Sequence, residues 1–211
     1  MTARSHCKDV VRSLVIAITV VTIGASCGTD SKAGGLAGAV RTPPLVVGSI
    51  SLPDVGAGDA LVTMQAPPNE LYLVYFGYTS CPDICPTTLS DIRVAIDDLP
   101  AAKADRVTVG MVTVDPERDT PEILIGYLDH FFEHSIALRT DDPAQLASAS
   151  KAFGVTWQIP SHSPGAAYNV AHTAVTYVID DTGTVVDEWP FGLTSDAMTS
   201  DLSTLLDKES T

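Results

Sequence analysis

Basic side chains are scarce in this sequence, and their scarcity limits what the protein can bind. The 211 residues include 12 Lys and Arg against 26 Asp and Glu, which gives a formal net charge of −14. Proteins that bind nucleic acid use clustered Lys and Arg to contact the phosphate backbone, so we expect no nucleic-acid partner. With 45% apolar and 18% charged residues, the chain is also unlike a disordered tail or a coiled coil.

The N-terminal region lacks a hydrophobic run long enough to span a bilayer, but it contains a shorter one. Its apolar stretch covers residues 14–23, whereas a membrane-spanning helix needs about 20 residues. Basic residues precede this stretch, and Gly24-Ala25-Ser26 follow it directly before Cys27. This order is typical of a secretory signal peptide.

Small residues placed directly before a cysteine resemble the lipobox of bacterial lipoproteins, although Gly24 stands where such boxes usually carry Leu. We predict that residues 1–26 are a signal peptide of the lipoprotein type and that Cys27 is lipidated. The mature protein would then be lipid-anchored to the cell membrane, on its extracytoplasmic face. Cleavage without lipidation and an uncleaved anchor are the alternatives.

Cysteine is rare as well, and its few positions are informative. Cys7 lies in the predicted signal peptide and Cys27 at the predicted lipid site, so Cys81 and Cys85 remain for the folded part. Two thiols four residues apart are too few for a disulfide framework, so we interpret them as one functional pair. Residues 27–44, rich in Gly, Ala, Ser, Thr and Pro, predict a flexible tether, and 45–211 predict one domain.

Within this domain, segments typical of strands alternate with segments typical of helices. Runs of apolar and β-branched residues predict strands at 71–78, 106–114, 136–138, 174–179 and 184–189. Apolar residues at helical spacing predict helices after the cysteine loop and at 121–132, 142–153 and from 195 onward. A short hairpin is predicted from 50–52 and 61–64. Because such alternation implies a largely parallel sheet, we predict an α/β, thioredoxin-like fold. Its central mixed sheet is flanked by helices, with an N-terminal hairpin and a late antiparallel hairpin.

The two cysteines lie in the loop after the first central strand, Gly77-Tyr-Thr-Ser-Cys-Pro-Asp-Ile-Cys-Pro86. Because Pro86 suits the first turn of a helix, Cys85 is expected at a helix N-terminus, where the helix dipole favours the thiolate. Side chains four positions apart on a helix lie roughly 5–6 Å from each other, which is farther than a disulfide prefers. Two thiolates from one loop favour a soft metal such as Cu(I). A pair with only a redox or packing role is the alternative.

A third metal ligand would have to come from one of the five histidines. His172 has the most suitable position, because it leads into the strand at 174–179 and can face the cysteine loop; an ordinary loop histidine is the alternative. The other four are weaker candidates: His6 in the signal peptide, His130 and His134 in or beside the 121–132 helix, and His162 in a loop.

Four segments of the chain resemble the Sco/SenC family. They are the loop at 77–86, Thr113-Val-Asp-Pro-Glu-Arg-Asp-Thr-Pro121, Lys151-Ala-Phe-Gly-Val155 and Ala171-His-Thr173. Members of this family are membrane-tethered, thioredoxin-like copper proteins implicated in assembling the copper centre of cytochrome c oxidase. The resemblance implies that Cys81, Cys85 and His172 are copper ligands.

The sequence departs from the family at Ala171, where the family usually carries Asp directly before the histidine. The missing carboxylate could weaken the orientation of the imidazole or change the tuning of copper. The charged residues of the second motif we interpret mainly as structural support for their loop: Asp115, Glu117, Arg118 and Asp119.

Three functions are compatible with these residues. The first is an extracytoplasmic copper metallochaperone, whose partner would be the copper-bearing subunit of cytochrome c oxidase or another copper-delivery protein. The second is a membrane-tethered thiol–disulfide reductase that uses Cys81 and Cys85 on client cysteines and needs no histidine. The third, a peroxiredoxin-like peroxidase, rests on the fold alone and needs a single activated cysteine. The cysteine spacing and the position of His172 favour the first.

Overall fold

A computed structural model describes residues 35–163 and 165–208 of the chain. The predicted signal peptide at 1–26 and the predicted lipid site at Cys27 lie outside these described residues. Within the described part of the chain, no helix is both long and apolar enough to cross a membrane.

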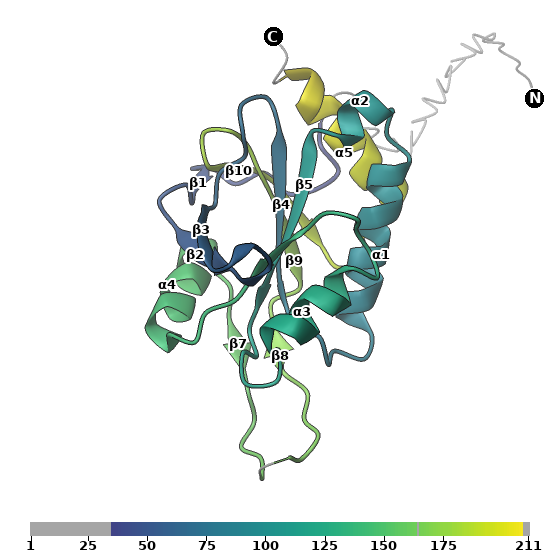
Figure 1. Ribbon diagram of the computed structural model, residues 1–211. Coiled ribbons are helices and arrows are strands. Elements are labelled where there is room, and N and C mark those ends of the chain that lie inside the picture. Colours follow the sequence, from purple (N-terminus) through teal and green to yellow (C-terminus); the bar gives the residue numbers. More distant parts are fainter. Residues whose placement is uncertain (1–34, 164, 209–211) are drawn as a thin grey trace, which may run out of the picture. The chain divides into compact units, whose positions relative to one another are not determined.

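Eight strands form one mixed sheet in the order β1-β10-β9-β4-β5-β6-β2-β3 (Figure 1). Strands β4, β5 and β6 run parallel, whereas β9 pairs antiparallel with β4 and β10. The prediction of an α/β, thioredoxin-like fold is confirmed, as are both hairpins: β2 with β3, and β9 with β10. The strands are β1 Leu45–Val46, β2 Ser51–Asp54, β3 Ala60–Thr63, β4 Leu71–Gly77, β5 Val107–Thr113, β6 Ile136–Leu138, β9 Val175–Ile179 and β10 Thr184–Pro190.

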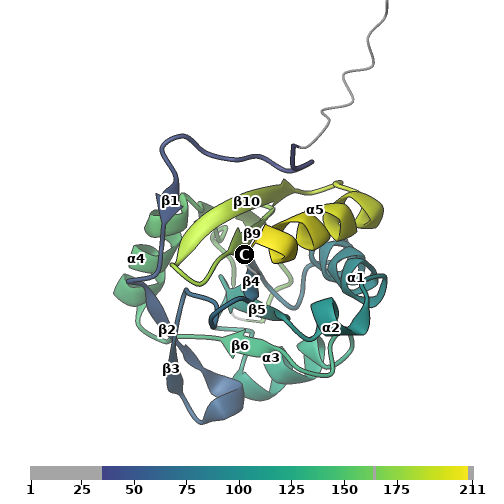
Figure 2. The ribbon, with the colours of Figure 1, turned by 90° about the horizontal axis from the view of Figure 1, so that it is seen from above.

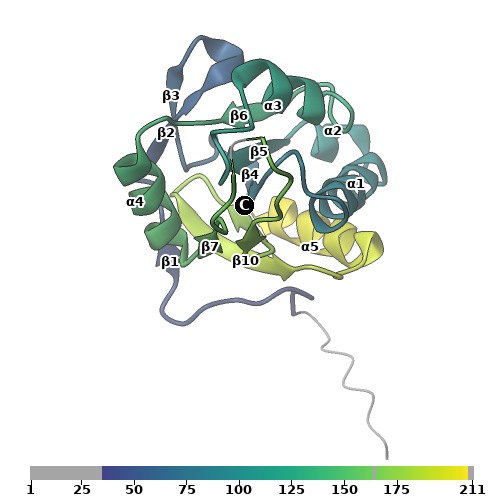
Figure 3. The ribbon, with the colours of Figure 1, turned by 90° about the horizontal axis from the view of Figure 1, so that it is seen from below.

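Helices cover both faces of the sheet (Figures 2 and 3). Helices α1, α3 and α5 lie on one face, where α1 and α5 pack against each other, and α4 lies on the other. This arrangement follows from right-handed crossovers, because the chain moves one way from β4 to β6 and then returns across the sheet to β9. The helices are α1 Ile84–Asp97, α2 Ala101–Ala104, α3 Pro121–Leu128, α4 Pro143–Phe153 and α5 Ser195–Lys208.

Helix α3 is shorter than the predicted range of 121–132. It ends at Leu128, and the backbone N–H groups of Phe131 and Phe132 then fold back onto the carbonyl of Leu128. Phe132 is buried, with 9% of its surface exposed. The apolar spacing continued past Leu128 because this turn, as well as the helix, directs side chains into the core.

Strand β4 is the centre of the core. All seven of its residues are buried, which explains the near-continuous apolar run, since a strand covered on both faces has no polar side. Its neighbour β5 ends beside it, at the same edge of the sheet. In a parallel sheet this carboxyl edge is where functional loops collect.

The described end of the predicted tether at 27–44 contacts the domain. The backbone N–H groups of Ala37 and Gly38 donate to the buried carboxylate of Asp201 in α5, at 2.8 and 3.1 Å, and Ala39 pairs with Glu188 of β10. A buried carboxylate needs such donors. Residues 37–39 are therefore part of the folded unit, unlike a free tether.

Candidate metal centre

The two predicted cysteines lie at the carboxyl end of β4, as expected. Helix α1 begins at Ile84, so Cys85 is its second residue and Pro86 stands in its first turn. The side chain of Cys85 is completely buried, whereas Cys81 lies at the rim with 9% of its surface exposed. Both cysteines are free thiols.

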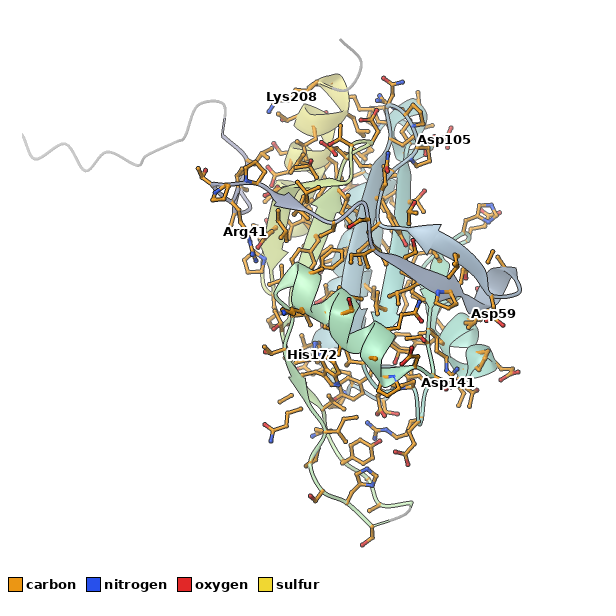
Figure 4. All side chains as sticks on the ribbon, turned by 90° about the vertical axis from the view of Figure 1, so that its left-hand side faces the viewer. Arg41, Asp59, Asp105, Asp141, His172 and Lys208 are labelled. Carbon is orange, nitrogen blue, oxygen red and sulfur yellow. The ribbon has the colours of Figure 1, made fainter. Side chains whose placement is uncertain are left out.

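His172 reaches the cysteines from a short hairpin that the sequence did not predict. Strand β7 (Trp157–Gln158) pairs antiparallel with β8 (Ala171–His172), and Trp157 is opposite His172. Figure 4 labels His172 at the end of the domain from which the connection between β7 and β8 projects. This hairpin directs the imidazole toward the cysteine loop.

The structure brings together all three predicted ligands. The distance from Cys85 Sγ to His172 Nε2 is 3.5 Å, and the ligand atoms of Cys81, Cys85 and His172 all lie within 4.8 Å of one another. Among the described residues, this is the cluster of His, Cys and acidic side chains with spacing suited to a metal ion. The other described histidines have different surroundings: His130 and His134 are exposed, and His162 stacks on Tyr168.

The imidazole of His172 is oriented for ligation despite Ala171. Its Nδ1 lies 3.0 Å from the carbonyl oxygen of Thr173, so Nδ1 carries the proton and Nε2 presents a lone pair to Cys85. Burial lowers the pKa of His172, and the bond to Thr173 opposes this only in part. Ala171 is exposed on the surface. The expected loss of imidazole orientation is therefore offset by a backbone carbonyl, which serves as the outer partner that ligating histidines use.

The pKa values of the two thiols are shifted in opposite directions, and the shift at Cys85 is opposite to the one we predicted. Burial raises the pKa of the Cys85 thiol to about 12, although Cys85 is at the helix N-terminus. Burial also raises the pKa of Cys81, but backbone hydrogen bonds from Asp83 and Cys85, together with side-chain hydrogen bonds with Cys85 and Tyr78, bring the pKa below its usual value. We predicted that the helix dipole favours the thiolate of Cys85, but complete burial outweighs the dipole and favours the thiol. Cys81 is the more acidic thiol.

Tyr75 is a neighbour of the site that the sequence analysis missed. Its buried hydroxyl donates to Cys85 Sγ at 3.6 Å, and its ring meets the ring of His172 edge-on at 6.1 Å. Gly77 provides the space, because a Cβ there would lie 3.1 Å from Cys85 Sγ. A tyrosine within a fully buried strand was the available signal, since its hydroxyl needs a partner inside the protein.

Asp119 of the second motif supports the cysteine loop, whereas the prediction for its charged residues was support of their own loop. The buried carboxylate of Asp119 accepts hydrogen bonds from the N–H and hydroxyl of Thr79 and from the hydroxyl of Thr113. These contacts tie the loop at 77–86 to the end of β5. Burial raises the pKa of Asp119 despite these bonds. Glu117, in contrast, is exposed.

A cleft of about 340 Å³ opens beside the ligands. Cys81, Ile84 and His172 are among the residues that line it, and Ile84 has 36% of its surface exposed. Cys81 is therefore the sulfur most accessible from outside, whereas Cys85 lies deeper.

Fold and site together define a thioredoxin-like protein with a set of ligands suited to a thiophilic metal: two thiols on one loop and a neutral imidazole on a separate strand. The chain belongs to the SCO1/SenC family, whose sequence pattern matches residues 54–207.

Individual proteins that are similar to the chain also carry Sco names. The chain is 40% identical over 116 residues to the SCO2-like protein of Rickettsia prowazekii, a match that covers 54% of this chain and 56% of that protein. The chain thus spans little more than half the length of this relative. Among solved structures, apo Sco1 of Thermus thermophilus has a TM-score of 0.71 at 32% identity, covering 82% of this chain and 98% of the other. Copper-bound ScoI of Bradyrhizobium japonicum has a TM-score of 0.63 at 32% identity, covering 75% and 98%.

Proposed function

We propose that the protein is a copper metallochaperone that works outside the cytoplasmic membrane and helps to assemble the copper centre of cytochrome c oxidase. The observation that carries this proposal is the convergence of Cys81, Cys85 and His172, with their ligand atoms within 4.8 Å of one another. Family membership supports it, as does the copper bound to the ScoI relative from Bradyrhizobium japonicum.

The donor set fits copper better than a hard cation. Thiolates select Cu(I), and imidazole suits Cu(II), so a site with both can hold either oxidation state. The protein's part is to present these groups. Cys81 at the rim would bind first as a thiolate, and Cys85 would then lose its proton, because a ligating sulfur must be deprotonated. The copper ion is the cargo in this scheme.

A copper carrier needs a metal site that its client can reach, and it needs to be located close to that client. The cleft at Cys81 leaves one side of the site open to a client. The predicted lipid anchor at Cys27 would hold the domain near membrane-bound clients, and several acyl chains hold a protein to a bilayer more firmly than one. The net charge of −14 favours clients with a neutral or basic docking surface. The copper-bearing oxidase subunit and another copper-delivery protein are the proposed partners.

One observation favours a second function, that of a membrane-tethered thiol–disulfide reductase. The pKa of Cys81 is lowered and that of Cys85 is raised. This difference suits a dithiol in which one thiolate attacks a client disulfide and the second thiol completes the exchange. Such a reductase would have no use for His172.

An anaerobic copper titration separates the two functions. Wild type should bind one Cu(I) per chain, and Cys81→Ser and Cys85→Ser should each abolish stable binding. His172→Ala should weaken Cu(II) binding far more than Cu(I) binding, because two thiolates suffice for Cu(I). His130→Ala, which changes an exposed histidine, is the matched control. Unchanged Cu(II) binding by His172→Ala would remove this residue from the site.

In cells, deletion of the protein should lower cytochrome c oxidase activity, and added copper should partly restore it. The double variant Cys81→Ser/Cys85→Ser should behave like the deletion. If this variant supported normal oxidase copper content under copper limitation, the metallochaperone proposal would fail. If a small-molecule reductant rescued the deletion where copper did not, the reductase function would replace it.

A further inference from the structure

Three residues from two loops form a compact cluster next to His172: Asp115, Arg118 and Tyr168. Asp115 and Arg118 follow β5 in the second sequence motif, whereas Tyr168 lies four positions before His172, in the connection between β7 and β8. These two segments are distant in sequence and come into contact only in the folded protein.

Hydrogen bonds connect all three residues of this cluster. The hydroxyl of Tyr168 donates to Asp115 Oδ1 at 2.9 Å, and Arg118 Nε donates to Asp115 Oδ2 at 2.5 Å. Arg118 Nη1 also donates to the carbonyl oxygen of Tyr168 at 2.9 Å. The side chain of Asp115 is completely buried. Arg118 therefore holds Tyr168 both directly and through a shared carboxylate.

Aromatic contacts extend this cluster to the metal ligand. The guanidinium carbon of Arg118 lies 3.6 Å from the ring centroid of Tyr168 and 5.5 Å from that of Tyr78. The ring of Tyr78 in turn meets His172 edge-on, with 5.7 Å between centroids. The cluster is thus linked to His172 in two ways: along the chain from Tyr168, and indirectly through the ring of Tyr78.

The backbone ladder of the hairpin that carries His172 is short. Strands β7 and β8 have two residues each, and hydrogen bonds between Thr156 and Thr173 close one end of this short ladder. Two-residue strands contribute too few backbone hydrogen bonds to fix a hairpin alone. The other end of the ladder leads to Val170 and then to Tyr168, where the cluster holds the chain.

We propose that Asp115, Arg118 and Tyr168 form a clamp that positions His172 against Cys85. The clamp rests on the proposed copper function and deepens it, because it would control the ligand that matters most for Cu(II). A site with a well-held imidazole keeps Cu(II), whereas a site with a loose imidazole keeps only Cu(I), through its two sulfurs. Asp115, Arg118 and Tyr168 are positioning residues and supply no ligand themselves.

Two conservative substitutions test the clamp. Tyr168→Phe keeps the ring and removes only the hydroxyl that bonds Asp115. Arg118→Lys keeps the charge but loses the planar group that stacks and donates in two directions. In the copper-loaded protein, each should weaken Cu(II) binding about fivefold to tenfold, the usual effect of one lost hydrogen bond. Each should leave Cu(I) binding within about twofold.

Matched controls make the same chemical changes elsewhere in the molecule. Tyr72→Phe removes the hydroxyl of a buried tyrosine near the start of β4, and Arg93→Lys changes an arginine that pairs with Asp97 on the surface of α1. Both controls should bind Cu(II) and Cu(I) like wild type. Equal losses in the controls and in the clamp variants would overturn the proposal.

A double-mutant cycle shows whether the clamp acts through His172. In the His172→Ala background, adding Tyr168→Phe should cause no further loss of Cu(II) affinity, because the ligand to be positioned is gone. If the two losses multiply instead, Tyr168 acts independently of His172 and the proposal is wrong. The Cu(II) EPR spectrum should show weaker nitrogen hyperfine coupling in Tyr168→Phe than in wild type or Tyr72→Phe.

A measurement without metal separates the clamp from the copper function. In the metal-free full chain, amide hydrogen exchange at His172 should be faster in Tyr168→Phe than in wild type or Tyr72→Phe, with global stability unchanged. If wild type binds no copper but His172 loses protection as expected, the copper function fails and the positional role of the clamp stands. Unchanged exchange at His172 in both clamp variants would overturn the clamp, whatever copper does.

Discussion

The sulfur of Cys85 lies 3.5 Å from Nε2 of His172, although the two residues are 87 positions apart in the sequence. Cys85 is fixed by the first turn of α1, and His172 by a two-residue strand. One ligand therefore belongs to a rigid element and the other to a small hairpin. The position of Cys85 therefore follows from the start of a helix, whereas that of His172 depends on tertiary contacts.

The hydroxyl of Tyr75 should tune the redox behaviour of bound copper. It donates to Cys85 Sγ, and a hydrogen bond to a ligating sulfur reduces the electron density that the sulfur gives to the metal. Tyr75→Phe should therefore stabilise Cu(II) relative to Cu(I) and lower the reduction potential. A tenfold change in the affinity ratio corresponds to about 59 mV for one electron. A potentiometric titration measures this shift, and an unchanged potential would show that the hydroxyl has no such role.

Gly77 should tolerate no side chain. A Cβ at this position would lie 2.7 Å from the ring of Tyr75 and 3.1 Å from Cys85 Sγ. Gly77→Ala should lower the free energy of unfolding by about 1–3 kcal/mol, the usual cost of overpacking a core, and should weaken copper binding. The matched control is Gly126→Ala in α3, where a Cβ meets nothing within 4 Å; it should be neutral or stabilising by up to about 1 kcal/mol. Urea denaturation curves for both variants give the comparison.

The two thiols should differ in reactivity in the metal-free protein. Burial raises the pKa of Cys81, but backbone and side-chain hydrogen bonds together bring it below its usual value, whereas burial raises the pKa of Cys85 to about 12. Near neutral pH, iodoacetamide should modify Cys81 first, because the thiolate is the reactive form. Peptide mass spectrometry after a short exposure locates the modification. Equal labelling of both cysteines would contradict the assignment.

Copper affinity should rise with pH for the same reason. Cys85 carries a proton in the metal-free protein and has to lose it on binding, so lower pH favours the metal-free form. Competition titrations against a Cu(I) chelator, at several pH values from about 6 to 8 and corrected for the protonation of the chelator, would show this trend. Affinity that is independent of pH would mean that Cys85 does not lose its proton on binding.

The buried carboxyl pair under the N-terminal segment should make stability depend on pH. Burial and a hydrogen bond with Asp201 raise the pKa of Asp187 to about 7, whereas an unfolded aspartate has a pKa of about 3.9. Between these values the folded protein keeps a proton that the unfolded chain releases. The free energy of unfolding should therefore fall as the pH rises from about 4 to 7, by at most roughly 1.4 kcal/mol per pH unit.

Asp187→Asn should flatten this part of the stability curve, because an amide does not titrate. The control is Asp59→Asn, at an exposed position with a φ of +64° that asparagine accepts. It should keep the wild-type slope. Chemical denaturation at a series of pH values measures both, and an identical slope in wild type and Asp187→Asn would rule out Asp187 as the source.

Some parts of the molecule were predictable because they depend on local chemistry. A strand formed by residues 71–78 has no polar face, so it fits only a position in the sheet that is covered on both faces. Pro86 marked the start of α1, and Gly154 adopts the left-handed conformation that ends α4. The helix at 121–132 was predicted too long, because a turn after Leu128 continues the apolar pattern that a helix would show.

The sequence by itself predicted the thioredoxin-like class and the cysteine pair, since both depend on residue type and on spacing along the chain, whereas His172 as the third ligand followed from the family resemblance. Tertiary structure decided the rest. Burial raised the pKa of Cys85 against the helix dipole, whereas hydrogen bonds brought that of Cys81 below its usual value. A carbonyl of Thr173 orients His172, and Asp115, Arg118 and Tyr168 come into contact from two separate loops. Desolvation and contacts between distant segments arise only when the chain is folded, and for this reason no pattern of neighbouring residues records them.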